Sequence, residues 1–337
     1  MCVFKRGTVP LKNTNSKKGI TVMVAMSMFD KGLSLTPHCQ FHQGEPITEI
    51  TPEQARKILD FDIIKEVSCR PNGEVIEGQF HLVRADHDIV IGDAVGSDFT
   101  ADNNAKVFDY IMANIVPNVP NMKIITAATC YSGATAFVDF QIGDTYQLPN
   151  DNSPQTKNLL FANATTKSSV SIGSHAQRIL CCNTLRIAMK QTQFKVSHTK
   201  SMMSTIYCDL DSIRKELEQN EIIMESEQFL ASKLITPDKV KSILDMVYPI
   251  EGKEKKALTH TTNLRDTTLA RFENNEQEGF TNHTYWSLYN AIGYNLSHKK
   301  TTANRDGAFV ELNQMAGLNA QKNGEIFTRI LDFAKAA

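Results

Sequence analysis

Polar and apolar residues alternate along residues 63–67, 74–82 and 88–95, and this pattern predicts three antiparallel strands. The first two are separated by Pro71, Asn72 and Gly73. Asn followed by Gly is a strong hairpin signal, because both residues tolerate the positive φ angles of a tight turn. We therefore expect a meander over this part of the chain.

Further along, short apolar runs lie on either side of turn-forming residues and predict more strands. A hairpin is expected over residues 122–129 and 135–142, around the turn at 130–134. Two more strands are expected at 159–164 and 168–172, and a short strand or loop at 194–198. Residues 144–156 read as an exposed polar loop.

Helical spacing predicts the remaining elements. Thr51, Pro52 and Gln54 form a capping box before a short helix ending near residue 59. Residues 98–116 predict a helix capped by Thr100 or Asp102. Another helix is expected over 176–191, and a long one begins near 199. From there the pattern is helical, with breaks near 221, 236–237 and 249 and later helices at 281–298 and 319–334.

These elements predict an α+β fold, with a mainly antiparallel sheet and packed helices followed by a helical C-terminal region. We expect a flexible basic arm over residues 1–19, an α+β core over 20–200 and a helical region over 201–337 packed on that core. The apolar run 20–29 (ITVMVAMSMF) reads as a buried strand, because it is too short to cross a bilayer.

The composition is that of an ordinary globular protein, with 41% hydrophobic and 22% charged residues among 337. Seven cysteines, including the adjacent Cys181 and Cys182, favour free thiols in a reducing bacterial cytoplasm. We expect no disulfide, no membrane segment and no cofactor. The sequence contains no GxxxxGK[ST], GxSxG or HExxH motif, which disfavours the enzyme classes that these motifs define.

Positive charge is unevenly distributed. The formal net charge is −1, yet residues 152–208, called here the acid-free segment, contain no Asp or Glu. Such sorting is typical of a surface that binds phosphate or another polyanion. A buried pair of strands that excludes charge would produce the same pattern. The segment's cations are Lys157, Lys167, Arg178, Arg186, Lys190, Lys195 and Lys200.

From this segment we predict a non-enzymatic protein that binds single-stranded DNA by charge neutralisation and base stacking, acts in replication, recombination or annealing, and forms a homo-oligomer. Phe161, Tyr131 and Tyr207 could add stacking faces, or could be core residues. The predicted nucleic-acid contacts are Lys167, Arg178, Asn183, Arg186, Lys190, Phe194, Lys195, His198 and Lys200.

Two other functions stay open. A metal-dependent nuclease would need carboxylates such as those of Asp86 and Asp88, although their place in an expected hairpin turn favours a solvated turn. His38, Cys39 and His42 have metal-ligand spacing but lack a fourth partner. Cys181 or Cys182 could pair with His175 or His198 as a thiol nucleophile, or could be a buried small hydrophobe. The third function is that of an assembly or anti-defence protein that binds an acidic partner.

Three sequence blocks carry a resemblance to a known family. They are residues 178–188 (RILCCNTLRIA) with 196–199 (VSHT), residues 41–47 (FHQGEPI), and residues 284–298 (TYWSLYNAIGYNLSH). Together they resemble the phage/plasmid-like protein family, domain of unknown function 932. Phe41 stands where that family usually has Trp, and Gly293–Asn295 replaces its usual Thr-Glu-Tyr. The resemblance implies a phage, prophage or plasmid origin and no established activity.

Overall fold

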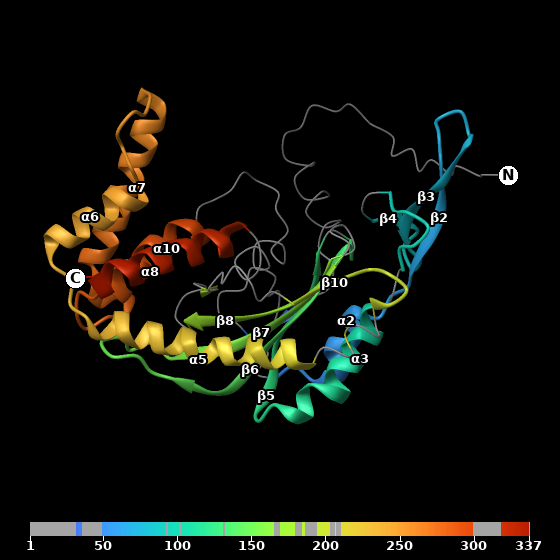
Figure 1. Cartoon of the computed structure of the whole chain (residues 1–337), viewed down its shortest axis with the longest axis horizontal. Coiled ribbons are helices and arrows are strands. Elements are labelled where there is room, and N and C mark those ends of the chain that lie inside the picture. Colours follow the sequence, from blue (N-terminus) through green and yellow to red (C-terminus); the bar gives the residue numbers. More distant parts are fainter. Residues whose placement is uncertain are drawn as a thin grey trace, which may run out of the picture.

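The computed structural model describes residues 32–35, 49–91, 94–100, 103–130, 132–164, 169–178, 184–185, 194–202, 206, 210–298 and 318–336. Within this part of the chain, a seven-stranded sheet forms the centre, and a three-stranded sheet and a group of helices lie at its two ends (Figure 1). The predicted α+β class is confirmed.

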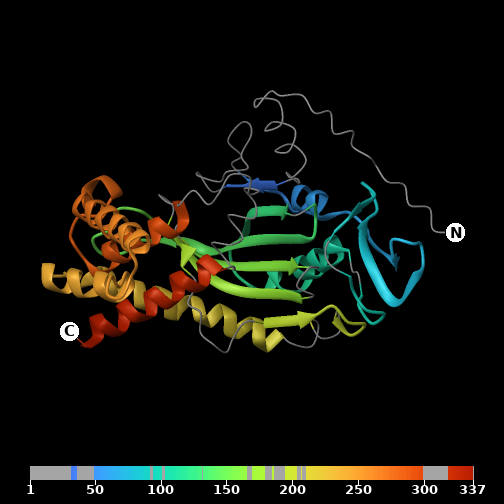
Figure 2. The ribbon, with the colours of Figure 1, turned by 90° about the horizontal axis from the view of Figure 1, so that it is seen from above.

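The large sheet is antiparallel between all neighbouring strands, in the order β1-β5-β6-β7-β8-β10, and β9 also pairs with β8. β5 to β8 form a meander, and Figure 2 shows β10 as an outer strand of the sheet. The strands are β1 (Gly32–Ser34), β5 (Met122–Cys130), β6 (Thr135–Tyr146), β7 (Gln155–Ala164), β8 (Ser169–Arg178), β9 (Thr184–Leu185) and β10 (Phe194–Ser197).

One face of this sheet is covered by α2 (Pro52–Leu59), α3 (Asn104–Asn114) and α5 (Leu210–Ser232) (Figure 1). The predicted capping box starts α2: the Thr51 hydroxyl accepts the Gln54 N–H, and the Gln54 side chain accepts the Thr51 N–H. Their apolar residues form one core with alternate residues of the strands, including Leu59, Phe108, Ile111, Val138, Phe140, Phe161 and Ile172.

The small sheet confirms the predicted meander and consists of β2 (Ile63–Cys69), β3 (Val75–Arg84) and β4 (Ile89–Val90). It has its own small core, which includes Phe61, Leu82, Ile91 and Phe99. The guanidinium of Arg84 lies 4.1 Å from the centre of the Phe61 ring and donates to the Ser132 carbonyl, so these contacts join the small sheet to the β5–β6 turn.

Gly133 in that turn is required by its surroundings. Its φ is +94°, and a Cβ atom there would lie 2.7 Å from Phe61 Cζ. We therefore expect Gly133→Ala to lower the free energy of unfolding by about 2–4 kcal/mol, from backbone strain plus overpacking. Gly143 also has a positive φ, +64°, but has nothing within 4 Å of an added Cβ. Gly143→Ala should therefore cost only about 1 kcal/mol in urea denaturation, and equal losses at both positions would contradict the expected clash.

The other end of the molecule is helical, with α6 (Pro237–Val247), α7 (Lys255–Glu273), α8 (Tyr285–His298) and α10 (Leu318–Ala336). Short 3₁₀ helices occupy Val116–Asn118 and Asn275–Glu278. A second core joins these helices to α5, and Trp286 of α8 is buried in it with Tyr289 and Phe327. Trp286 and Tyr285 are therefore core residues.

Several local predictions are wrong. Residues 176–178 belong to β8 and 184–185 to β9, not to a helix over 176–191, and the rest of that range lies outside the described residues. An apolar run this short fits a buried strand as well as a helix. α5 continues through residue 221 without a break, and α3 is capped by Asn103, whose side chain accepts the Ala105 N–H at 2.7 Å.

The predicted polar loop at 144–156 is also different. β6 extends to Tyr146 and β7 begins at Gln155, while Leu148, Asp151 and Ser153 between them are buried. The basic arm, the apolar run 20–29 and the residues His38, Cys39 and His42 lie outside the described residues. None of the described helices combines the length and the apolar character that crossing a bilayer requires.

Candidate nucleic-acid interface

The candidate interface lies on β10 and the turn that follows it. Lys195, Ser197, Thr199, Lys200 and Ser201 are exposed there. β10 pairs with β8 through one edge, and no described strand pairs with its other edge. Exposed ammonium and hydroxyl groups beside free backbone groups are the chemistry that positions phosphate. We call these five residues the β10 surface.

Buried residues alternate with the exposed residues of the β10 surface and hold that surface in position. Val196 belongs to the core under the sheet, and Met202 is fully buried in the same core. His198 lies between them, with its ring centre 5.1 Å from that of Phe99, while its carbonyl accepts the Thr100 N–H at 3.2 Å. Thus the turn is attached both to the sheet and to the segment that leads into α3.

His198 itself does not belong to the exposed surface, although the sequence suggested it as a contact. Its side chain is buried, and neither ring nitrogen has a well-formed hydrogen bond with a described residue. This burial lowers the pKa of His198 to about 4, because the charged imidazolium would lose its hydration. His198 is therefore neutral at pH 7 and adds no charge for phosphate.

The other described cations of the acid-free segment, Arg178 and Lys157, lie away from the β10 surface. Arg178 ends β8, seven residues from Ser171, the β8 residue opposite Lys195, which corresponds to about 23 Å along a strand. Lys157 lies on the α5 side of the sheet, where its ammonium is 2.6 Å from Glu221. Phe194 is in β10, but its side chain is not described. Lys167, Asn183, Arg186 and Lys190 lie outside the described residues.

α5 makes one face of the sheet acidic. The helix contains six carboxylates and two cations, and Glu216 accepts the Ser174 N–H from the middle of β8. The Ser174 hydroxyl also donates to the Glu216 carbonyl. α5 thus covers this face with a helix of net negative charge, which disfavours the binding of a polyanion there.

A cluster of three buried polar side chains, which the sequence pattern did not predict, lies on the face of the sheet opposite α5. Asp139 of β6 is 2.8 Å from His175 Nε2 through one oxygen and accepts the Asn158 side-chain N–H at 2.8 Å through the other. All three side chains are buried, and His175 Nδ1 has no hydrogen-bond partner among the described residues. Asp139 thus holds the His175 ring in the core, while Cys181 and Cys182, its suggested thiol partners, lie outside the described residues.

A second buried carboxylate connects α5 to the end of β6. The Tyr146 hydroxyl donates to Glu227, which is almost completely buried. Loss of hydration, with a smaller contribution from the nearby Asp151, raises the pKa of Glu227 to about 8. Desolvation and the neighbouring carboxylate also raise the pKa of Tyr146 above its ordinary value.

Asp151 in turn accepts the indole N–H of Trp286 at 2.8 Å and the Gln155 side-chain N–H at 3.2 Å. Trp286 comes from the third of the sequence blocks described above. The Trp of that block thus contributes to the buried junction between the sheet and the helical end, in accord with its position in the core.

Asp86, one of the two carboxylates suggested for a nuclease, is paired with a cation. Asp86 forms an ion pair with Arg84 at 2.7 Å in the turn between β3 and β4, and this hydrogen bond lowers the pKa of Asp86. Across the residues that the structure describes, no three His, Cys, Asp or Glu side chains lie close enough together to hold a metal ion.

Comparison with known proteins gives one match. No curated protein and no solved structure matches the chain. A family model matches residues 93–317, more than half of the chain, and this range includes the blocks at 178–199 and 284–298 but begins after the block at 41–47. The chain therefore belongs to the family described as domain of unknown function (DUF932).

Proposed function

We propose that the protein binds single-stranded nucleic acid through the β10 surface. The observation that supports this proposal is that Lys195 and Lys200 are exposed together, among hydroxyl groups, on an outer strand of the sheet. Lysine ammonium groups that neutralise phosphates release counterions, which favours binding at low salt. Hydroxyl groups of serine and threonine and free backbone N–H groups can hydrogen-bond to phosphates. Such bonds position the nucleic acid without distinguishing its bases.

The wider biological proposal follows from this binding. Binding of a single strand without sequence preference is expected of a protein that acts in replication, recombination or strand annealing of a phage or plasmid. On the α5 side Lys157 is already paired with Glu221, which favours the β10 edge as the contact surface. Phe161, one of the candidate stacking residues, is buried in the core, so the described part of the proposal rests on charge and hydroxyl contacts.

The test is a fluorescence-anisotropy titration with a labelled single-stranded oligonucleotide over a range of salt concentrations. We expect the variant Lys195→Ala/Lys200→Ala to bind about tenfold more weakly, and the slope of log K against log[salt] to fall by about 1.4, because two phosphate contacts are lost. Lys322 and Lys335, exposed on α10, provide a matched control pair.

Lys322→Ala/Lys335→Ala should bind like the wild type. An unchanged affinity and salt slope in the β10 variant would remove the β10 surface as the contact site. A wild-type protein that binds no single strand even at low salt would remove the function itself.

A further inference from the structure

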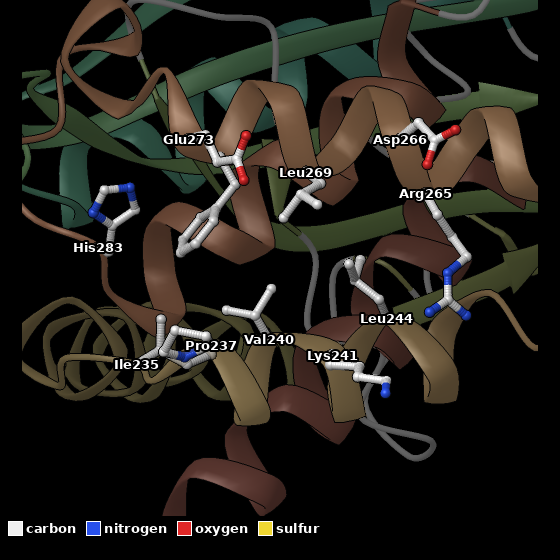
Figure 3. Close-up of a pocket in the computed structure, with 11 residues that line it drawn as sticks. Ile235, Pro237, Val240, Lys241, Leu244, Arg265, Asp266, Leu269, Glu273 and His283 are labelled. Atoms are coloured by element: carbon white, nitrogen blue, oxygen red, sulfur yellow. The ribbon is translucent and has the colours of Figure 1, made fainter.

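A groove of about 730 Å³ separates α6 from α7 (Figure 3). Val240 and Leu244 line it from α6, and Leu269 and Phe272 line it from α7. Figure 3 shows the Val240 and Leu269 side chains extending into the space between the two helices. Leu269 is 37% exposed, which is unusual for a large apolar side chain beside other apolar groups unless another element covers it.

The α7 rim of the groove carries two exposed carboxylates, while α6 contributes the exposed cation Lys241. Asp266 and Glu273 line the groove, are exposed, and form no ion pair with any described residue. Arg265, on the same helix, is already neutralised by Asp245 at 2.7 Å and also donates to the Tyr248 carbonyl. The seven-residue spacing of Asp266 and Glu273 places both carboxylates on one side of α7 with Leu269 between them.

The first half of α7 carries exposed lysines, which complement the carboxylates on the α7 rim of the groove. α7 has 19 residues and α6 has 11, so α7 continues beyond the groove and projects away from the rest of the molecule (Figure 1). Lys255, Lys256 and Leu258 are exposed there, and Leu258 is 38% exposed. Thr261 is the one buried residue among described positions 255–263.

An antiparallel pair of α7 helices from two copies would bury the exposed leucines of both halves and bring lysine and glutamate side chains together. If Leu258 of one copy lies opposite Leu269 of another, the antiparallel register places Lys255 within one residue of the position opposite Glu273 of that copy. A two-fold axis repeats each contact, so the four leucines and both charge pairs are used. The stripe Leu258, Thr262, Arg265 and Leu269 has the alternating three- and four-residue spacing of such helix packing.

We propose that a second copy of this chain occupies the groove, forming a symmetric dimer in which the first half of each α7 packs between α6 and α7 of the other. The helix surfaces favour this partner: the half with Lys255, Lys256 and Leu258 meets the half with Leu269 and the exposed carboxylate of Glu273. The dimer does not rest on nucleic-acid binding, because the β10 surface and the α6–α7 groove are formed by different elements.

The test exchanges the charges of the two halves. Variant A is Lys255→Glu/Lys256→Glu and variant B is Glu273→Lys. Sedimentation velocity on the full chain should show a dissociation constant at least tenfold higher for A alone and for B alone, because like charges then face each other. An equal mixture of A and B should recover dimers, since A's new glutamates meet B's new lysine and the native pair forms at the other end.

The controls keep the charge changes but move them elsewhere. Lys322→Glu/Lys335→Glu matches variant A, and Glu225→Lys on α5 matches variant B; both should dimerise like the wild type. Leu258→Asp should dissociate the dimer while leaving the circular dichroism spectrum unchanged. A wild type that is monomeric at about 100 µM, roughly a hundredfold above a micromolar dissociation constant, would overturn the proposal. So would variants A and B that each dimerise normally, or a mixture that stays monomeric.

Discussion

Glu227→Gln is expected to make the protein more stable at pH 8 and to change its stability little at pH 5. Glu227 has a pKa of about 8 in the folded protein and 4.5 as an ordinary glutamate. Between these values the unfolded chain has released a proton that the folded protein still holds. Stability therefore falls as the pH rises through this window, by about 1.4 kcal/mol per pH unit for this group.

Glutamine cannot ionise, and its carbonyl oxygen can still accept the Tyr146 hydroxyl. The difference between variant and wild type should therefore grow from near zero at pH 5 to roughly 3–4 kcal/mol at pH 8. Urea denaturation at four pH values measures it. Glu225 is exposed on the same helix, so Glu225→Gln should show no such growth. A constant difference for Glu227→Gln across this range would show that its carboxyl ionises normally.

Asp139→Ala is expected to be among the most damaging single changes, with a loss of about 3–5 kcal/mol in the free energy of unfolding. Asp139 is the acceptor for both His175 and Asn158, and all three are buried. Its removal leaves two polar groups in the core without a partner, at a place where water cannot replace it.

Asp144 offers a matched comparison, because it is an aspartate of the same strand, β6, with an exposed side chain. Asp144→Ala should change the free energy of unfolding by less than about 0.5 kcal/mol. Asp139→Asn, which keeps one oxygen acceptor, should fall between the two. If Asp139→Ala costs no more than Asp144→Ala, the buried group contributes nothing to stability.

The sequence predicted best what depends on neighbouring residues. The capping box at Thr51 and the hairpin turn before Glu74 each occupy a few consecutive positions, and the structure contains both. The range 176–191 failed because its apolar majority is compatible with two periodicities, and pairing with β7 decides in favour of a strand over Ala176–Arg178. Pairing of this kind is not visible in a single short window.

The acid-free segment is clear in the sequence, but its described cations are only partly grouped in the folded protein. Lys157 belongs to the acid-free segment, yet its partner Glu221 is 64 residues away in the sequence, on the helix α5 that packs on one face of the sheet. Lys195 and Lys200 do lie together and exposed. The spatial grouping of cations depends on which face each strand position takes, and a shift of one residue would reverse it.

The buried polar groups could not have been predicted from local patterns. His175 lies 36 residues from Asp139, and Trp286 lies 135 residues from Asp151. Only the register of the sheet and the packing of α8 bring these pairs together. The available signal was that polar residues interrupt otherwise apolar strands, at Asp139 in β6 and Asn158 in β7.

β10 also bears on how the protein stays in solution. An outermost strand with free N–H and C=O groups is a template for any other extended chain, and this template is a common start of aggregation. Lys195 stands in the middle of that strand and is exposed, and a lysine there opposes the stacking of like strands because their charges repel. A valine at position 195 would favour the strand conformation and remove this protection, so insoluble material would accumulate although no native contact had been lost.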